Sequence, residues 1–187
     1  CGRIVRTFLN MARQRPAERG EVQLNDVVRA AADMLGYTLR SHGIELELRL
    51  DDTLPIVPAD GDQVGQVVLN LIVNAQQALA GHEGLRRIGV ATGVDAASDQ
   101  AWLRVADSGP GVPEALHGSV FDPFFTTKAE GMGTGVGLSV SRSIAREHGG
   151  ELLLEPPQPG SGAAFRLRLP LALSTAPGPE AREPAAP

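Results

Sequence analysis

The sequence predicts an α/β (α+β) domain, a two-layer sandwich in which a mixed sheet carries three helices on one face. Segments with strand-like apolar patterns occur at residues 44–50, 86–93, 101–106, 151–155 and 163–169. Longer segments with helical apolar spacing are interleaved with them, and this interleaving is typical of a sheet covered by helices. A parallel sheet with helices on both faces would contradict this prediction.

Composition limits the classes of protein that fit. The chain has 187 residues, of which 42% are hydrophobic, and this is enough for the core of one domain. The net charge of -5 argues against a nucleic-acid binder, and the single cysteine excludes a disulfide framework. No apolar run approaches the roughly 20 residues of a membrane span. We therefore expect a cytoplasmic segment with no nucleic-acid partner and no membrane contact of its own.

The first helical pattern covers residues 3–15 and ends near Pro16. A helix of this length is marginal in isolation, so we expect it to pack against another segment. A short extended piece follows at residues 21–24.

The second helix is expected to have Asn25 or Asp26 as its N-cap and to end at Gly43. Its predicted apolar face consists of Val27, Val28, Ala31, Met34, Leu35 and Leu39. The strictly alternating segment 44–50 then predicts a half-buried strand, and residues 54–58 form an extended segment bounded by prolines.

The third helix is expected to begin at Asp60 or Asp62 and to run to about residue 81. Three amide side chains fall about one turn apart on one side of it: Asn70, Asn74 and Gln77. Asparagine is a poor residue for a helix interior, so this row indicates a binding site. The alternative is an ordinary solvated face.

The most distinctive stretch of the sequence is rich in glycine. Glycines at 131, 133, 135 and 137 precede a helical pattern that ends at Gly149 and Gly150. A glycine loop that opens a helix presents free N–H groups and the positive end of the helix dipole to an anion, usually a phosphate. The alternative is a flexible linker. No P-loop motif and no dinucleotide-binding glycine motif after a strand occur in the chain.

The last predicted elements are the strands at 151–155 and 163–169, which form a hairpin. Residues 173–187 are rich in proline and alanine and are expected to be disordered.

Four segments together resemble the catalytic, ATP-binding domain of bacterial sensor histidine kinases, within the gyrase–Hsp90–histidine kinase–MutL superfamily. The segment Asn70–Ala75 resembles the N box, Asp107–Gly111 the G1 box, Phe121–Phe125 the F box, and Gly133–Leu138 the G2 box. The residues of the F-box and G2-box segments are most similar to those of the nitrogen-, oxygen- and dicarboxylate-sensing kinases. The resemblance implies a Bergerat-type ATP-binding fold over residues 20–172.

The resemblance also implies roles for individual residues. Asp107 is expected to accept a hydrogen bond from the adenine amino group, Asn74 to bind Mg²⁺, and Lys128, the chain's one lysine, to contact the terminal phosphate. Asn70, Asn74 and Lys128 are the expected catalytic residues. Phe121, Phe124 and Phe125 are expected to anchor a mobile lid at residues 119–134. The full set expected to bind ATP is Asn70, Asn74, Gln77, Asp107, Gly109, Gly111, Val112, Phe121, Thr126, Thr127, Lys128, Gly133, Thr134, Gly135, Val136, Gly137 and Leu138.

The sequence departs from the family pattern at three places. ATP-hydrolysing relatives carry a glutamate where this chain has Asn70, which is no general base, so phosphate transfer is favoured over hydrolysis. Many kinases carry a cation one turn after the magnesium asparagine, where this chain has Gln77. The last strand has Ala163 and Ala164 where a threonine is common.

The sequence contains no segment that resembles the phosphate-accepting region of a histidine kinase. None of His42, His82, His117 and His148 has the sequence context of an acceptor, and a favourable interaction with the helix dipole is the expected role of His148. We expect the acceptor on a helical hairpin upstream, with residues 1–19 as the end of this dimerisation domain. The implied partners are the upstream dimerisation and phosphoacceptor domain of the same protein and a response regulator receiver domain. The resemblance also implies that the full-length protein is a homodimer, and it leaves membrane anchoring of that protein open. The competing interpretations are an anti-sigma-type serine kinase or ATPase and a non-catalytic nucleotide-sensing module.

Overall fold

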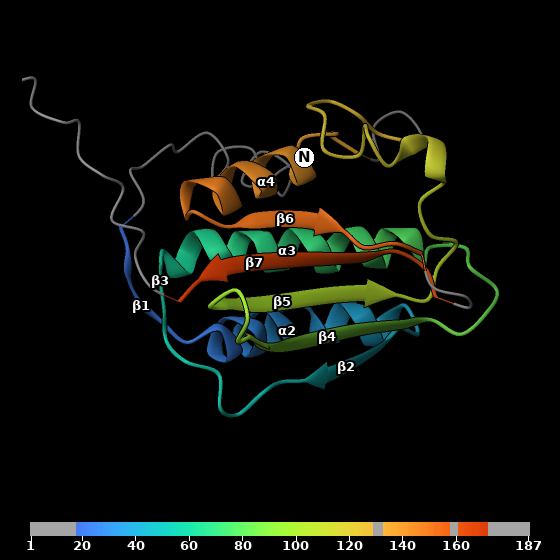
Figure 1. Cartoon of the computed structure of the whole chain (residues 1–187). Helices are drawn as coiled ribbons and strands as arrows, with labels where there is room; N and C mark the ends of the chain where they lie inside the picture. The colour runs from blue at the N-terminus through green and yellow to red at the C-terminus, as the bar shows by residue number, and fades with distance from the viewer. Residues whose placement is uncertain (1–17, 129–132, 158–160, 172–187) are drawn as a thin grey trace, which may run out of the picture.

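The structure, a computed structural model, describes residues 18–128, 133–157 and 161–171. Its main sheet has five strands in the order β2-β4-β5-β7-β6 (Figure 1). The strands are β2 (Glu45–Arg49), β4 (Arg87–Asp95), β5 (Gln100–Asp107), β7 (Ala164–Pro170) and β6 (Glu151–Leu154). The β2–β4 pair is parallel and the other three pairs are antiparallel, so the sheet is mixed, as the sequence predicts.

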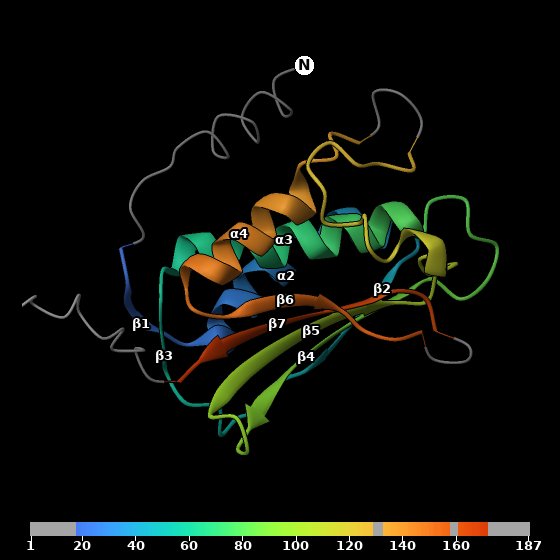
Figure 2. The same ribbon diagram turned by 45° about the horizontal axis from the view of Figure 1, so that its top comes forward.

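Three helices lie together on one face of this sheet (Figure 2). They are α2 (Leu24–Ser41), α3 (Gly61–Ala78) and α4 (Gly137–Glu147). The prediction of a two-layer sandwich is thus confirmed. The two extended pieces of the sequence, β1 (Gly20–Val22) and β3 (Val57–Ala59), pair with each other as a small antiparallel sheet. A short 3-10 helix, η1 (Glu114–Leu116), lies between β5 and α4 along the chain.

The core fills the space between the sheet and the helices. The central strand β5 alternates in burial, as a strand with one face on the core does. Ala101, Leu103 and Val105 are buried toward the helices, whereas Trp102 and Arg104 are only partly buried. The largest side chains of α3 that are fully buried are Leu71 and Ile72. Each such side chain stabilises the fold by roughly 1.5–3 kcal/mol. Helix α3 is therefore rigidly held, and its uncovered side can present polar residues without loss of the core.

Helix α2 differs from the sequence prediction in two details. It begins at Leu24 with Gln23 as N-cap, and the proposed cap Asn25 is buried in the first turn. The Asn25 side chain donates to the Asp51 carbonyl oxygen and accepts from Thr92 Oγ1 at 2.7 Å, so tertiary contacts use the amide that a cap would need. Met34, predicted on the apolar face, is 69% exposed because the helix turns this position away from the sheet.

Helix α3 begins as predicted. The Asp60 carboxylate accepts hydrogen bonds from the N–H groups of Asp62 and Gln63, and this is the geometry of an N-cap. Its second oxygen accepts from the Glu18 N–H at 3.0 Å. The predicted helix at residues 3–15 and the predicted disordered tail at 173–187 lie outside the described residues.

His148 at the end of α4 has a role beyond the predicted one. The ring is 3% exposed, and its Nε2 accepts a hydrogen bond from the Asp60 N–H at 2.9 Å. Nδ1 must then carry the proton, which it donates to the Ile144 carbonyl oxygen at 2.8 Å. The Nδ1–H group thus meets a last-turn carbonyl oxygen at the negative end of α4, which is in line with the predicted interaction. His148 also joins the end of α4 to the start of α3.

We expect His148→Ala to lower the free energy of unfolding by about 1–3 kcal/mol, because it leaves the half-buried Asp60 N–H without its acceptor. His42→Ala is the matched control, since His42 caps α2 but is exposed. The control should lose under about 0.5 kcal/mol in urea denaturation followed by circular dichroism. Equal losses in the two variants would contradict a stabilising role for the hydrogen bond between His148 and Asp60.

None of the helices in the described ranges is long and apolar enough to cross a membrane.

Candidate nucleotide-binding site

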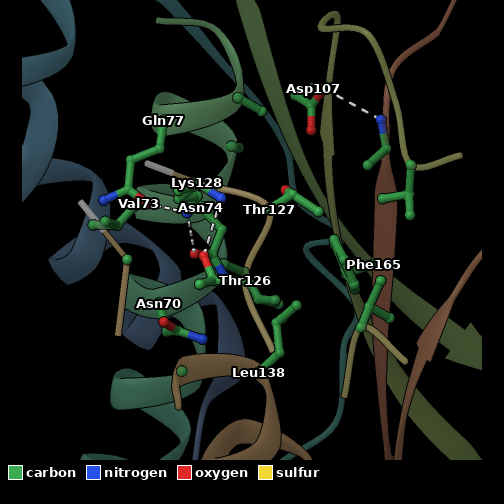
Figure 3. A pocket seen from close by; sticks show the side chains of 18 of the residues that line it. Asn70, Val73, Asn74, Gln77, Asp107, Thr126, Thr127, Lys128, Leu138 and Phe165 are labelled. Carbon is green, nitrogen blue, oxygen red and sulfur yellow. Dashed lines mark hydrogen bonds between the residues drawn. The ribbon is translucent and has the colours of Figure 1, made fainter. Parts of the chain in front are cut away.

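A cavity of about 790 Å³ opens between α3, the ends of β5 and β7, and the segments that precede α4 (Figure 3). This volume is within the range of small-molecule sites. One wall is the amide row of α3, and the opposite side holds Asp107. The sequence places these elements far apart along the chain, and the packing of α3 on the sheet brings them together.

Asn70, Asn74 and Gln77 all line the cavity from α3, so this amide row is not an ordinary solvated face. The Asn70 amide donates to Ser141 Oγ on α4 at 3.0 Å. Its oxygen lies against Gly137, where a Cβ would come within 2.3 Å of Asn70 Oδ1. The first residue of α4 is therefore a glycine because the Asn70 amide occupies the space of a side chain.

Asp107 is 7% exposed at the end of β5. Its Oδ1 accepts from the N–H groups of Gly109 at 2.8 Å and Ala163 at 3.2 Å. The other carboxylate oxygen points into the cavity (Figure 3). Burial raises the pKa of Asp107, although the two N–H donors act in the opposite direction. One buried acceptor with a fixed direction is thus presented to a ligand.

Lys128 enters from the other side of the cavity. Its Nζ donates to Asn74 Oδ1 at 3.4 Å and to Gln77 Oε1. Burial lowers the pKa of Lys128. Both acceptors are neutral amide oxygens, so the contact leaves the ammonium charge uncompensated.

The glycine segment before α4 approaches the backbone of the preceding loop. Gly135 has φ +65°, in the left-handed region, and a Cβ there would lie 2.4 Å from the Phe124 carbonyl carbon. Helix α4 then starts without a side-chain cap, so its first N–H groups are available to an anion.

The phenylalanines of the F-box segment have three different environments. Phe121 makes an edge-to-face contact with Phe165 at 6.1 Å, and the Arg142 guanidinium lies 4.7 Å from its ring. Phe125 lines the cavity. Phe124 is 77% exposed, so the prediction that it anchors this segment is wrong. Its left-handed φ of +67° directs its backbone toward Gly135 and its side chain to solvent. Residues 129–132 of the predicted lid lie outside the described residues.

Most of the predicted site residues meet in this one cavity. Those that line it are Asn70, Asn74, Gln77, Asp107, Gly111, Val112, Thr126, Thr127, Lys128, Gly133, Thr134, Gly135, Gly137 and Leu138. Gly109, Phe121 and Val136 do not line it. Gly109 acts through its N–H on Asp107, Phe121 packs behind Phe165, and Val136 precedes α4.

Sequence reasoning missed the support of Asp107 by the last hairpin. The Gly162 N–H donates to the Asp107 carbonyl oxygen at 2.9 Å, and a Cβ on Gly162 would come within 2.1 Å of Asp107 Oδ1. Phe165 and Ala163 from β7 also line the cavity. The glycine directly before the strand was the available signal. Ala163 and Ala164 have no hydroxyl group, but the Ala163 N–H still donates to the Asp107 carboxylate.

The lining of this cavity would fit a magnesium ion that also has phosphate oxygens as ligands. Within the described part of the chain, no cluster of three His, Cys, Asp or Glu side chains could hold a metal. Mg²⁺ commonly takes one or two protein oxygens, several waters and substrate phosphate oxygens. The Asn74 amide oxygen can serve as such a ligand.

Comparison with known proteins agrees with this geometry. Residues 59–173 match the family described as histidine kinase-, DNA gyrase B- and HSP90-like ATPase. The two-component sensor PprA of Pseudomonas aeruginosa is 44% identical over 144 residues, which are 76% of this chain and 15% of PprA. The catalytic domain of histidine kinase ThkA has a TM-score of 0.72 and 31% identity over 82% of this chain and 96% of its own. ThkA in complex with the response regulator protein TrrA gives a TM-score of 0.71 and 28% identity, over 90% of this chain and 46% of that chain.

Fold and site together define an ATPase domain of the α/β sandwich class. The chain belongs to the family of histidine kinase-, DNA gyrase B- and HSP90-like ATPases, and the curated proteins that it resembles include sensor kinases of two-component systems. It spans only a small part of the curated sensors that it matches.

Proposed function

We propose that this domain binds Mg-ATP and transfers the terminal phosphate to a histidine on an upstream helical hairpin, for relay to a response regulator. The observation that carries the proposal is the buried Asp107, with one oxygen fixed by two backbone N–H groups and the other facing the cavity. Adenine presents an amino donor where guanine presents a carbonyl oxygen. A carboxylate held in this way therefore selects adenine.

The phosphates are expected to lie at the opposite side of the cavity. The uncapped start of α4, beginning at Gly137, offers backbone N–H groups, and Lys128 offers a positive charge. Magnesium, held by Asn74, would neutralise charge on the phosphate oxygens. These groups orient the terminal phosphate, and orientation supplies most of the catalysis in phosphoryl transfer.

Transfer of the phosphate to a protein is favoured over hydrolysis of ATP because the expected phosphate end of the cavity has no carboxylate among its described lining residues. Among the described residues that line the cavity, Asp107 is the only carboxylate, and it lies at the adenine end. Asn70, at the place of the catalytic glutamate of hydrolysing relatives, has its amide bonded to Ser141. No residue of the described lining can then activate water as a general base at the phosphate end.

The remaining proposals concern the longer protein. Residues 1–19 are the end of a dimerisation and phosphoacceptor hairpin, residues 20–172 form the ATP-binding domain, and residues 173–187 are a tail. The full-length protein is a homodimer whose kinase part is cytoplasmic, and its partner is a receiver domain. The ThkA complex with a response regulator supports this choice of partner.

The test uses ATP labelled on its terminal phosphate. The isolated chain should bind Mg-ATP in calorimetry and take up no label, because none of its four histidines has the sequence context of an acceptor. A protein extended by the upstream hairpin should become labelled through an acid-labile phosphoramidate, and Asn74→Ala in that protein should not.

Acid-labile label on His42, His82, His117 or His148 of the isolated chain would contradict the proposal. Acid-stable label would indicate a serine kinase instead, steady hydrolysis an ATPase, and binding without transfer in the extended protein a nucleotide sensor.

A further inference from the structure

Lys128 is the chain's one lysine, and its ammonium lies between two amide oxygens of neighbouring turns of α3 (Figure 3). It donates to Asn74 Oδ1 at 3.4 Å and to Gln77 Oε1. Among the described residues, no carboxylate forms an ion pair with it. A half-buried ammonium without a counter-charge attracts an anion, and the cavity that it faces is the proposed phosphate site.

The two acceptors cannot keep the same roles when nucleotide is bound. Asn74 Oδ1 is the oxygen that would hold magnesium, and a divalent cation there would repel the Lys128 ammonium from Asn74. Gln77 Oε1, one turn further along α3, is the acceptor that remains within its reach.

We propose that Gln77 is a positioning residue that gives the site its preference for ATP over ADP, because it keeps the Lys128 ammonium beside the terminal phosphate. This inference rests on the proposed nucleotide function. It also explains the neutral amide at a position where many kinases carry a cation. A cation at position 77 would repel Lys128. The positive charge is therefore supplied by Lys128, and the Gln77 amide on α3 only orients it.

The test is calorimetric titration of the chain with Mg-ATP and with Mg-ADP. Gln77→Ala should lower the affinity for ATP by about threefold to tenfold and change that for ADP by less than about twofold. Gln77→Glu should lower ATP affinity further, because its carboxylate pairs with Lys128 and adds negative charge near the phosphate. Gln76→Ala, which changes the neighbouring glutamine outside the cavity lining, is the matched control and should behave as wild type.

A swap separates positioning from a merely structural effect. Lys128→Gln alone should bring the two affinities close together, and the double variant Lys128→Gln with Gln77→Lys should recover a clear preference for ATP. Equal affinities of the wild type for ATP and ADP would overturn the inference, as would equal losses for both nucleotides in Gln77→Ala or a failed swap. No binding of either nucleotide by the wild type would instead contradict the proposed function itself.

Discussion

Replacing Asp107 by asparagine should abolish ATP binding while leaving the fold at least as stable as the wild type. The asparagine carbonyl can still accept from the Gly109 and Ala163 N–H groups, which keeps the loop in place. Its amide nitrogen then points into the cavity and presents a donor to the adenine amino group, also a donor. The loss should exceed about 1.5 kcal/mol, which is the scale of a hydrogen bond to a charged group.

The stability of this variant follows from the direction of the pKa shift. Burial raises the pKa of Asp107 in the folded protein. The protonated group is therefore favoured by folding, and its contribution to stability is lost as pH rises from the unfolded pKa through the raised folded pKa. At neutral pH the ionised Asp107 destabilises the fold, and asparagine removes this cost.

Calorimetric titration with ATP and thermal unfolding near pH 5 and pH 8 measure the two effects. Asp33→Asn on the exposed face of α2 is the control and should change neither. An ATP affinity of Asp107→Asn within about threefold of wild type would show that Asp107 does not read adenine. A melting temperature well below that of the wild type at pH 8 would contradict the linkage argument.

Gly135→Ala should be the other severe change. A Cβ at this position would lie 2.4 Å from the Phe124 carbonyl carbon and 2.5 Å from its oxygen, which is backbone and cannot rotate away. The φ of +65° adds about 1–2 kcal/mol for any residue with a side chain. The loop must shift to relieve both, and the wall that holds the phosphates shifts with it. We expect ATP affinity to fall at least about tenfold.

Gly118→Ala is the matched control, because a Cβ there meets nothing within 4 Å and the glycine has no left-handed φ. It should bind ATP as the wild type does. Titration of both variants with ATP measures the two affinities. Wild-type affinity in Gly135→Ala would mean that the close approach of Gly135 to Phe124 has no part in the site.

The local patterns of the sequence were enough to predict most of the helices and strands and part of the site. Strand alternation and helix spacing follow from backbone periods of 2 and 3.6 residues, so the sheet strands, the three helices and the N-cap Asp60 could be predicted. The same period placed Asn70, Asn74 and Gln77 on one side of α3. The predictions that failed, the cap at Asn25 and the burial of Met34 and Phe124, depend on which neighbours pack against a residue.

The sequence by itself determined the elements, the amide row and the glycine segment that opens α4, because each is encoded within a few residues. Only the tertiary structure decided which groups meet. The partners of Asp107, Lys128 and His148 lie 56, 54 and 88 residues away along the chain, at Ala163, Asn74 and Asp60. No local period encodes such pairs. They arise from the register of β5 on β7 and from the packing of α3 against the sheet and α4, which bury distant polar groups where each must find a partner.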